Sequence, residues 1–133
     1  MEFVTRKEGI AVSKPNGTDV VYYLFSEFEV HYNEFMPGTV QEWHHHNKIE
    51  EVLYLVEGRL EAQWIQDEEI YSRPLSSGDL VRVKNYVHTF LNPFPEKAVG
   101  LVFRFVPDGT DKRDLIKNDK VLDPPPILLD TKR

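Results

Sequence analysis

The chain has 133 residues, no cysteine, five histidines and a formal net charge of −6. Without cysteine, thiol nucleophiles, iron–sulfur ligation and cysteine-based zinc sites are excluded, so a metal must be held by His, Asp, Glu or main-chain oxygen. The acidic balance, with no stripe of Lys and Arg, argues against nucleic acid as a partner. No apolar run has the length of a signal peptide or a membrane span, and we expect a soluble, cytoplasmic protein that does not bind membranes.

Short apolar runs separated by turn residues predict strands along most of the chain and little helix. The expected strands are residues 20–26, 28–36, 51–57, 59–66, 80–84, 88–91 and 98–106. Gly58 separates two of them at hairpin distance, and the charged residues 66–69 are typical of a solvated hairpin turn. Strands that recur every 8 to 12 residues or so predict an antiparallel sandwich or barrel.

Alternation along two of these strands predicts which side chains share a face. One side of the strand at 28–36 carries Phe28, Val30, Tyr32 and Met36. The other side carries Glu29, His31 and Asn33, and we expect it to face solvent, with His31 as a surface histidine. In contrast, residues 51–56 are apolar on both faces, which is typical of a strand inside a sheet.

The last part of the chain differs in composition from the rest. Residues 108–120 are polar and predict a loop or a short helix, and three consecutive prolines at 124–126 must be extended. Apolar residues near the end predict an arm that packs on the barrel or on a neighbouring subunit: Val121, Leu122, Ile127, Leu128 and Leu129. We therefore expect a single domain over residues 1–133, with a core at about 20–107 and an extension at 108–133.

The segment 38–58 carries the candidate metal ligands. His44 and His46 lie two residues apart, so on an extended segment they point to the same side, while His45 points away. Glu51 opens the strand that follows. We expect Glu50 to be a solvated carboxylate and Trp43 to pack in the core or at the rim.

The spacing of these residues resembles the first motif of the cupin superfamily. The matching positions are Gly38, His44, His46, Glu51 and Gly58. The matches to the second motif are Gly78, His88 and Asn92. Residues 84–87 depart from it, because the family usually has a proline and a glycine there and the gap to His88 is one residue shorter.

The resemblance implies an all-β, antiparallel jelly-roll barrel that binds one divalent transition metal, Fe, Mn, Ni or Zn, through three histidines and one glutamate. The implied ligands are His44, His46, Glu51 and His88. Two open positions on an octahedral ion would take a small organic substrate, and the resemblance makes a dioxygenase the leading activity. Isomerisation, decarboxylation and non-catalytic binding of a small ligand remain alternatives, since the fold hosts unrelated activities.

Two further points stay open in the sequence. We expect a homodimer, as is common for small cupins, with residues 20–25 and the C-terminal arm offering surface for it. A general base does not stand out. The unranked candidates for groups near the metal are Tyr54, Tyr86, His31 and Gln63.

Overall fold

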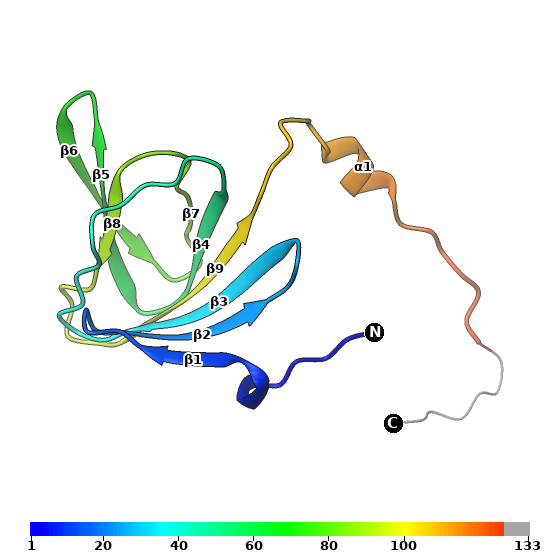
Figure 1. Ribbon diagram of the computed structural model, residues 1–133, viewed down its shortest axis with the longest axis horizontal. Helices are drawn as coiled ribbons and strands as arrows, with labels where there is room; N and C mark the ends of the chain where they lie inside the picture. Colours follow the sequence, from blue (N-terminus) through cyan, green and yellow to red (C-terminus); the bar gives the residue numbers. More distant parts are fainter. Residues whose placement is uncertain (127–133) are drawn as a thin grey trace.

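The computed structural model describes residues 1–126 and is built almost entirely of antiparallel strands (Figure 1). In chain order the elements are η1 (Arg6–Glu8), β1 (Ile10–Ser13), β2 (Thr18–Leu24), β3 (Phe28–Phe35), β4 (Glu50–Glu57), β5 (Arg59–Gln66), β6 (Glu69–Ser76), β7 (Leu80–Arg82), β8 (His88–Leu91), β9 (Ala98–Phe105) and α1 (Arg113–Asn118). The sequence prediction missed β1 and β6, which are both edge strands with mostly exposed side chains. Edge strands bury little, and β6 even contains Pro74, which an edge can accommodate.

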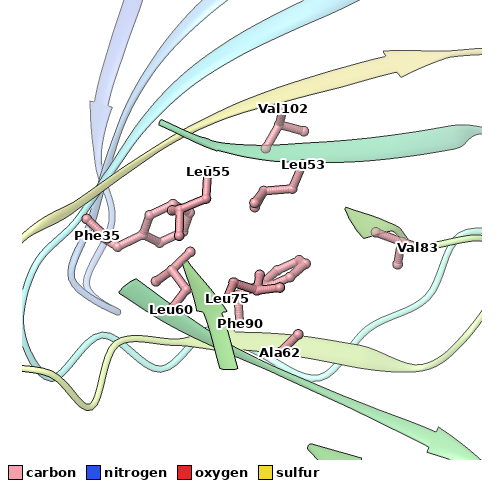
Figure 2. Packing of buried hydrophobic residues seen from close by; sticks show 10 residues of the cluster. Phe35, Leu53, Leu55, Leu60, Ala62, Leu75, Val83, Phe90 and Val102 are labelled. Carbon is pink, nitrogen blue, oxygen red and sulfur yellow. The ribbon is translucent and has the colours of Figure 1, made fainter. Parts of the chain in front are cut away.

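The strands form two sheets that curl toward one another, as a jelly-roll barrel requires (Figure 1). The larger sheet has the order β1-β2-β3-β9-β4-β7 and the smaller one the order β6-β5-β8. The side chains that meet between the sheets are Phe35, Leu53, Leu55, Leu60, Ala62, Leu75, Val83, Phe90, Ala98 and Val102 (Figure 2). The predicted fold class is confirmed, and the apolar core occupies only part of the interior.

The alternation predicted for β3 is present, but its two sides are reversed. His31 and Asn33 are 4% and 5% exposed, whereas Phe28 is 48% exposed. The register pairs Phe28 with Phe105 and Val30 with Phe103, so the outer face of the larger sheet is largely aromatic. The expectation that the polar side of β3 faces solvent was wrong for His31 and Asn33, because they line a polar cavity inside the barrel, whereas the Glu29 side chain is 39% exposed.

The prediction of an internal strand at 51–57 is confirmed. β4 lies between β9 and β7, and its inward residues Leu53 and Leu55 are almost fully buried. On its outer face, Tyr54 and Val56 are partly exposed. One apolar face of β4 therefore packs in the core, and the other lies on the outside of the sheet.

Two turns depend on left-handed backbone. Gly58, between β4 and β5, has φ +81°, and a Cβ there would lie 2.7 Å from the carbonyl oxygen of Lys97. Only glycine fits such a conformation and approach. The hairpin between β5 and β6 turns at Asp67 and Glu68, both with positive φ, which confirms the predicted turn at 66–69.

Beyond β9 the chain leads away from the barrel through α1 (Figure 1). Val121 and Leu122 are 79% and 82% exposed, so these two residues do not pack on the barrel as expected. The other apolar residues of the predicted arm, at 127–129, lie outside the described residues. Among residues 1–126, no helix is long and apolar enough to cross a membrane.

Candidate metal centre

Three separate segments bring the predicted ligands together at one end of the barrel interior. His44 and His46 lie on the extended segment between β3 and β4, Glu51 on β4 and His88 at the start of β8. Reciprocal main-chain hydrogen bonds of 3.1 and 2.9 Å pair His44 with His88, which joins the segment to the smaller sheet. The four side chains thus come from both sheets and from the segment that links them.

The ligand atoms of the four residues all lie within 4.8 Å of one another. Nε2 of His46 is 3.0 Å and Nε2 of His88 is 3.5 Å from Oε2 of Glu51. Two ligands about 2.1 Å from one ion, at a right angle, would lie about 3.0 Å apart. The spacing therefore suits a single ion, and the residues that could hold it are His44, His46, Glu51 and His88.

Hydrogen bonds orient two of the imidazoles for this role. Nδ1 of His44 donates to the carbonyl of Glu42, and Nδ1 of His88 donates to the carbonyl of Tyr86, both at 2.8 Å. A carbonyl oxygen only accepts, so in each ring Nδ1 carries the proton and Nε2 presents its lone pair. Nε2 of His88 is buried and has no hydrogen-bond partner among the described residues, as a metal-ligating nitrogen requires.

Glu51 is held ionised in a buried position. Its side chain is 6% exposed, and its Oε1 accepts hydrogen bonds from Nε and Nη2 of Arg104 at 3.0 and 2.9 Å. Burial by itself would raise the pKa of Glu51, but the positive charge and the hydrogen bonds of Arg104 hold it low, at about 2. Burial also lowers the pKa of His46, which favours the neutral imidazole that a metal needs.

A cavity of about 390 Å³ opens directly onto this cluster. Besides the four residues, the polar and aromatic groups of its wall are Lys14, Asn16, Tyr22, His31, Asn33, Gln41, Glu42 and Arg104. Nε2 of His31 lies 2.9 Å from Oε2 of Glu29, and the Tyr22 ring meets the imidazole edge-on at 4.6 Å. Burial lowers the pKa of His31, so the predicted surface histidine is a buried, neutral ring in the cavity wall.

The sequence did not single out Arg104 or Glu29 as parts of this site. Arg104 is the one charged residue of β9, and Glu29 stands two residues before His31. Two signals in the sequence point to these residues. Arg104 is a single charge on an otherwise apolar strand, and Glu29 belongs to the polar side of a strand in the middle of the sheet. Neither signal says which face is inside, so the assignment needed the assembled sheets.

Some expectations for the remaining candidate residues agree with the structure and others do not. His45 is exposed, as expected, and Trp43 is 42% exposed, so it does not pack in the core. Glu50 is not the solvated carboxylate that we expected, because Arg82 binds both of its oxygens and its side chain is 11% exposed. Of the unranked groups, Tyr54 lies on the outer sheet face, away from the cavity.

Gln63 and Tyr86 line a second cavity, of about 330 Å³, that also borders His88. Residues 84–87, where the sequence departs from the second cupin motif, also include an unusual backbone conformation. Lys84 has φ +55°, so a lysine adopts the left-handed backbone that glycine favours. His88 nevertheless lies within the cluster.

Asn92, the last residue of the second motif, is fully buried. Its Nδ2 donates to the carbonyls of Phe35 and Glu96 at 2.9 and 2.8 Å, and its Oδ1 accepts from the main-chain N–H of Phe94 at 3.0 Å. Asn92 therefore connects β3 to the turn after β8 and acts on the fold, outside the metal centre.

The chain is thus a small two-sheet antiparallel barrel in which a His–Glu cluster that could hold a metal ion faces a cavity. The chain belongs to the cupin family: the sequence profile described as Cupin domain matches residues 31–104. No curated protein sequence matches the chain.

Solved structures with different roles share this fold. Oxalate oxidase superimposes with a TM-score of 0.64 at 19% identity, over 78% of this chain and 59% of its own. A putative sugar phosphate isomerase from Acidithiobacillus ferrooxidans gives 0.60 at 22% identity, over 80% of this chain and 76% of its own. Drosophila melanogaster CENP-C bound to CAL1 gives 0.66 at 17% identity, over 75% and 82%. At these identities the likeness concerns the fold alone.

Proposed function

We propose that this protein is a metal-dependent enzyme that acts on a small polar organic molecule bound in the cavity beside His44, His46, Glu51 and His88. A dioxygenase is the leading activity, with Fe, Mn, Ni or Zn as the candidate ions. The observation that carries the proposal is the unpartnered, buried Nε2 of His88, which faces the other ligand atoms at the cavity wall.

The cavity residues have distinct roles in this proposal. A bound divalent ion would supply Lewis acidity and open coordination positions. Asn33 and Gln41 offer amide donors and acceptors that can orient a polar substrate, and Lys14 adds a positive charge. Phe35, Phe90 and Val102 form an apolar wall of the cavity, which limits the water that can enter with the substrate.

His31 supports a second candidate, a metal-assisted isomerase. The Glu29 carboxylate accepts the proton of Nε2, so Nδ1 of His31 is left as the basic nitrogen of the ring. A neutral base in the same cavity as the metal ligands can take a proton from a carbon next to a carbonyl and return it elsewhere.

Metal content and turnover test the proposal. The purified protein should contain a transition metal near one equivalent, and the iron-loaded form should consume O₂ with a panel of a catechol, a 1,3-diketone and a thiol. The double variant His44→Ala, His46→Ala should lose the metal, whereas His45→Ala, at the exposed position between them, should keep it. Full metal content in the double variant would reject the ligand assignment.

Proton exchange separates the two candidate activities. The zinc-loaded protein cannot perform redox chemistry, so exchange of the carbon-bound protons of hydroxyacetone in D₂O, followed by proton NMR, reports proton transfer alone. Exchange that is lost in His31→Gln and kept in His45→Gln supports the isomerase. A protein that binds metal and small ligands but shows neither O₂ uptake nor exchange would be a non-catalytic binding cupin.

We also infer a homodimer that uses the outer face of the larger sheet. Phe28, Tyr54, Phe103 and Phe105 are 38% to 48% exposed there, which is unusual for neighbouring aromatic residues of a lone subunit. Within residues 20–25, which were first expected to serve this role, Val20 and Val21 are 3% and 8% exposed, and only the end of the segment is open, with Leu24 at 51% and Phe25 at 36%. A second copy of the same face would bury the aromatic side chains without introducing an unpaired charge.

A further inference from the structure

A row of charged residues crosses the inner face of the larger sheet. The register places Arg104 of β9 opposite Glu29 of β3 on one side and opposite Glu51 of β4 on the other. The next inward positions toward the core, Val102 and Leu53, are apolar and buried. A cation therefore lies between two carboxylates at the border between core and cavity.

The two carboxylates have different partners, and Arg104 binds only one of them. Glu29 is engaged with His31, while both Nε and Nη2 of Arg104 donate to Oε1 of Glu51. The other oxygen of Glu51, Oε2, faces His46 at 3.0 Å and His88 at 3.5 Å. Arg104 thus donates two hydrogen bonds to Oε1 of Glu51, and the two histidines lie beside Oε2.

We propose that Arg104 is a positioning residue that restricts Glu51 to a single metal-ligating oxygen, Oε2, and so keeps two adjacent coordination positions open for a chelating ligand. This inference rests on the metal site of the proposed function. A carboxylate without such a partner can bind one ion through both oxygens, which would fill one of those positions. Outer partners of ligating groups commonly set ligand orientation in this way.

A second Glu–Arg pair next to the site provides a matched comparison. Glu50 precedes Glu51 on β4 and points to the opposite face, where Arg82 donates Nε to Oε1 at 2.8 Å and Nη2 to Oε2 at 2.9 Å. That arginine binds both oxygens of its carboxylate, so it leaves neither free for an ion. Removing Arg82 deletes an arginine–glutamate pair without changing the lining of the 390 Å³ cavity beside the four candidate ligands.

The test uses the cobalt(II)-loaded protein and two probes that are followed by cobalt absorption. Acetohydroxamate chelates through two oxygens and needs two open positions, whereas azide binds through one atom. In Arg104→Met, Oε1 of Glu51 is free to reach the ion, and we expect the affinity for acetohydroxamate to fall at least about tenfold more than the affinity for azide. The loss of positive charge affects both anions alike, so the ratio of the two affinities isolates the blocked position.

Two further variants complete the design. Arg104→Lys keeps a donor and the charge beside Oε1, and we expect the ratio to return most of the way to the wild-type value. Arg82→Met should leave the ratio unchanged. Circular dichroism establishes that each variant is folded.

Three outcomes in Arg104→Met would overturn this inference without contradicting the metal site proposed for the wild-type protein. An equal loss of both affinities in Arg104→Met would show that the arginine contributes charge alone, and unchanged affinities would show that it contributes neither. A folded Arg104→Met that no longer loads cobalt would also contradict it, because a freed Glu51 should still ligate. Failure of the wild-type protein to load cobalt would overturn both this inference and the proposed function.

Discussion

His31 and Glu29 form a pair on the inner face of β3, with Nε2 of the buried imidazole 2.9 Å from Oε2 of a carboxylate whose side chain is 39% exposed. Alternation places residues two apart on the same side of a strand, so the pair follows from extended backbone. The burial of His31 does not follow from the backbone, because β3 could have turned either face toward the interior. The pair gives the cavity a neutral imidazole with one free nitrogen, separate from the imidazoles of the metal centre.

The ring of His31 should carry its proton on Nε2 and should titrate below the ordinary histidine range. Burial lowers its pKa, and the hydrogen bond with Glu29 partly opposes that effect. Nitrogen-15 NMR of the chelator-treated protein should show the Nε2–H form at neutral pH. In Glu29→Ala the pKa of His31 should fall further, and a rise would contradict this account.

Acid should destabilise the metal-free protein partly through Glu51. Its pKa is about 2 in the folded chain against 4.5 for an ordinary glutamate, so its stabilising effect is present above about pH 4.5 and is lost as the pH falls through about 2. The difference corresponds to about 3 kcal/mol of unfolding free energy. Urea unfolding across this range should show a weaker pH dependence for Glu51→Gln than for wild type. Glu50→Gln, beside the exposed Arg82, should change the dependence less; an equal change would contradict the prediction.

Removing the metal should lower the melting temperature without unfolding the barrel. An ion present at 100 times its Kd stabilises by about 2.7 kcal/mol, which corresponds to a shift of roughly 10 °C for a chain of this size. The core between the sheets contains no proposed ligand, so it should persist. Circular dichroism of the chelated protein should keep the strand signal; a coil spectrum would show that the barrel depends on the ion.

Gly58→Ala should destabilise the fold far more than Gly38→Ala. Both glycines have positive φ, but a Cβ at Gly38 meets nothing within 4 Å, whereas at Gly58 it meets the backbone of Lys97 and Ala98. We expect about 1 kcal/mol for the strained conformation alone at Gly38 and about 3 kcal/mol at Gly58, measured by urea unfolding. Equal losses would mean that the close approach to Lys97 is not significant.

The outer aromatic face should mediate dimerisation. Light scattering at micromolar concentration should give twice the subunit mass of 15.6 kDa, and Phe103→Glu should give the subunit mass because it places a charge in the shared face. Ile116→Glu, on the exposed helix α1, is the control and should remain dimeric. A wild-type monomer would refute the assembly.

Local sequence pattern was enough to predict much of this protein. The cupin resemblance identified the residues that come together, His44, His46, Glu51 and His88, because that spacing specifies both residue type and strand position. Turns were also predictable: Gly58 stands where the backbone has positive φ, which favours glycine, and the charged residues 66–69 indicated a solvated hairpin turn. The strands β1 and β6 escaped prediction because almost all of their side chains are exposed and they lack a buried, alternating face.

The sequence could not determine which face of each strand points into the barrel, or in which register distant strands pair. Period-two alternation separates Glu29, His31 and Asn33 from their neighbours, but only packing of one sheet on the other decides which side is inside. Likewise, Arg104 stands 53 residues from Glu51, and β9 places it beside that carboxylate only because β9 pairs with β4 in one particular register. Local spacing was enough to identify the candidate ligands, whereas the groups that surround and orient them depend on the long-range pairing of strands.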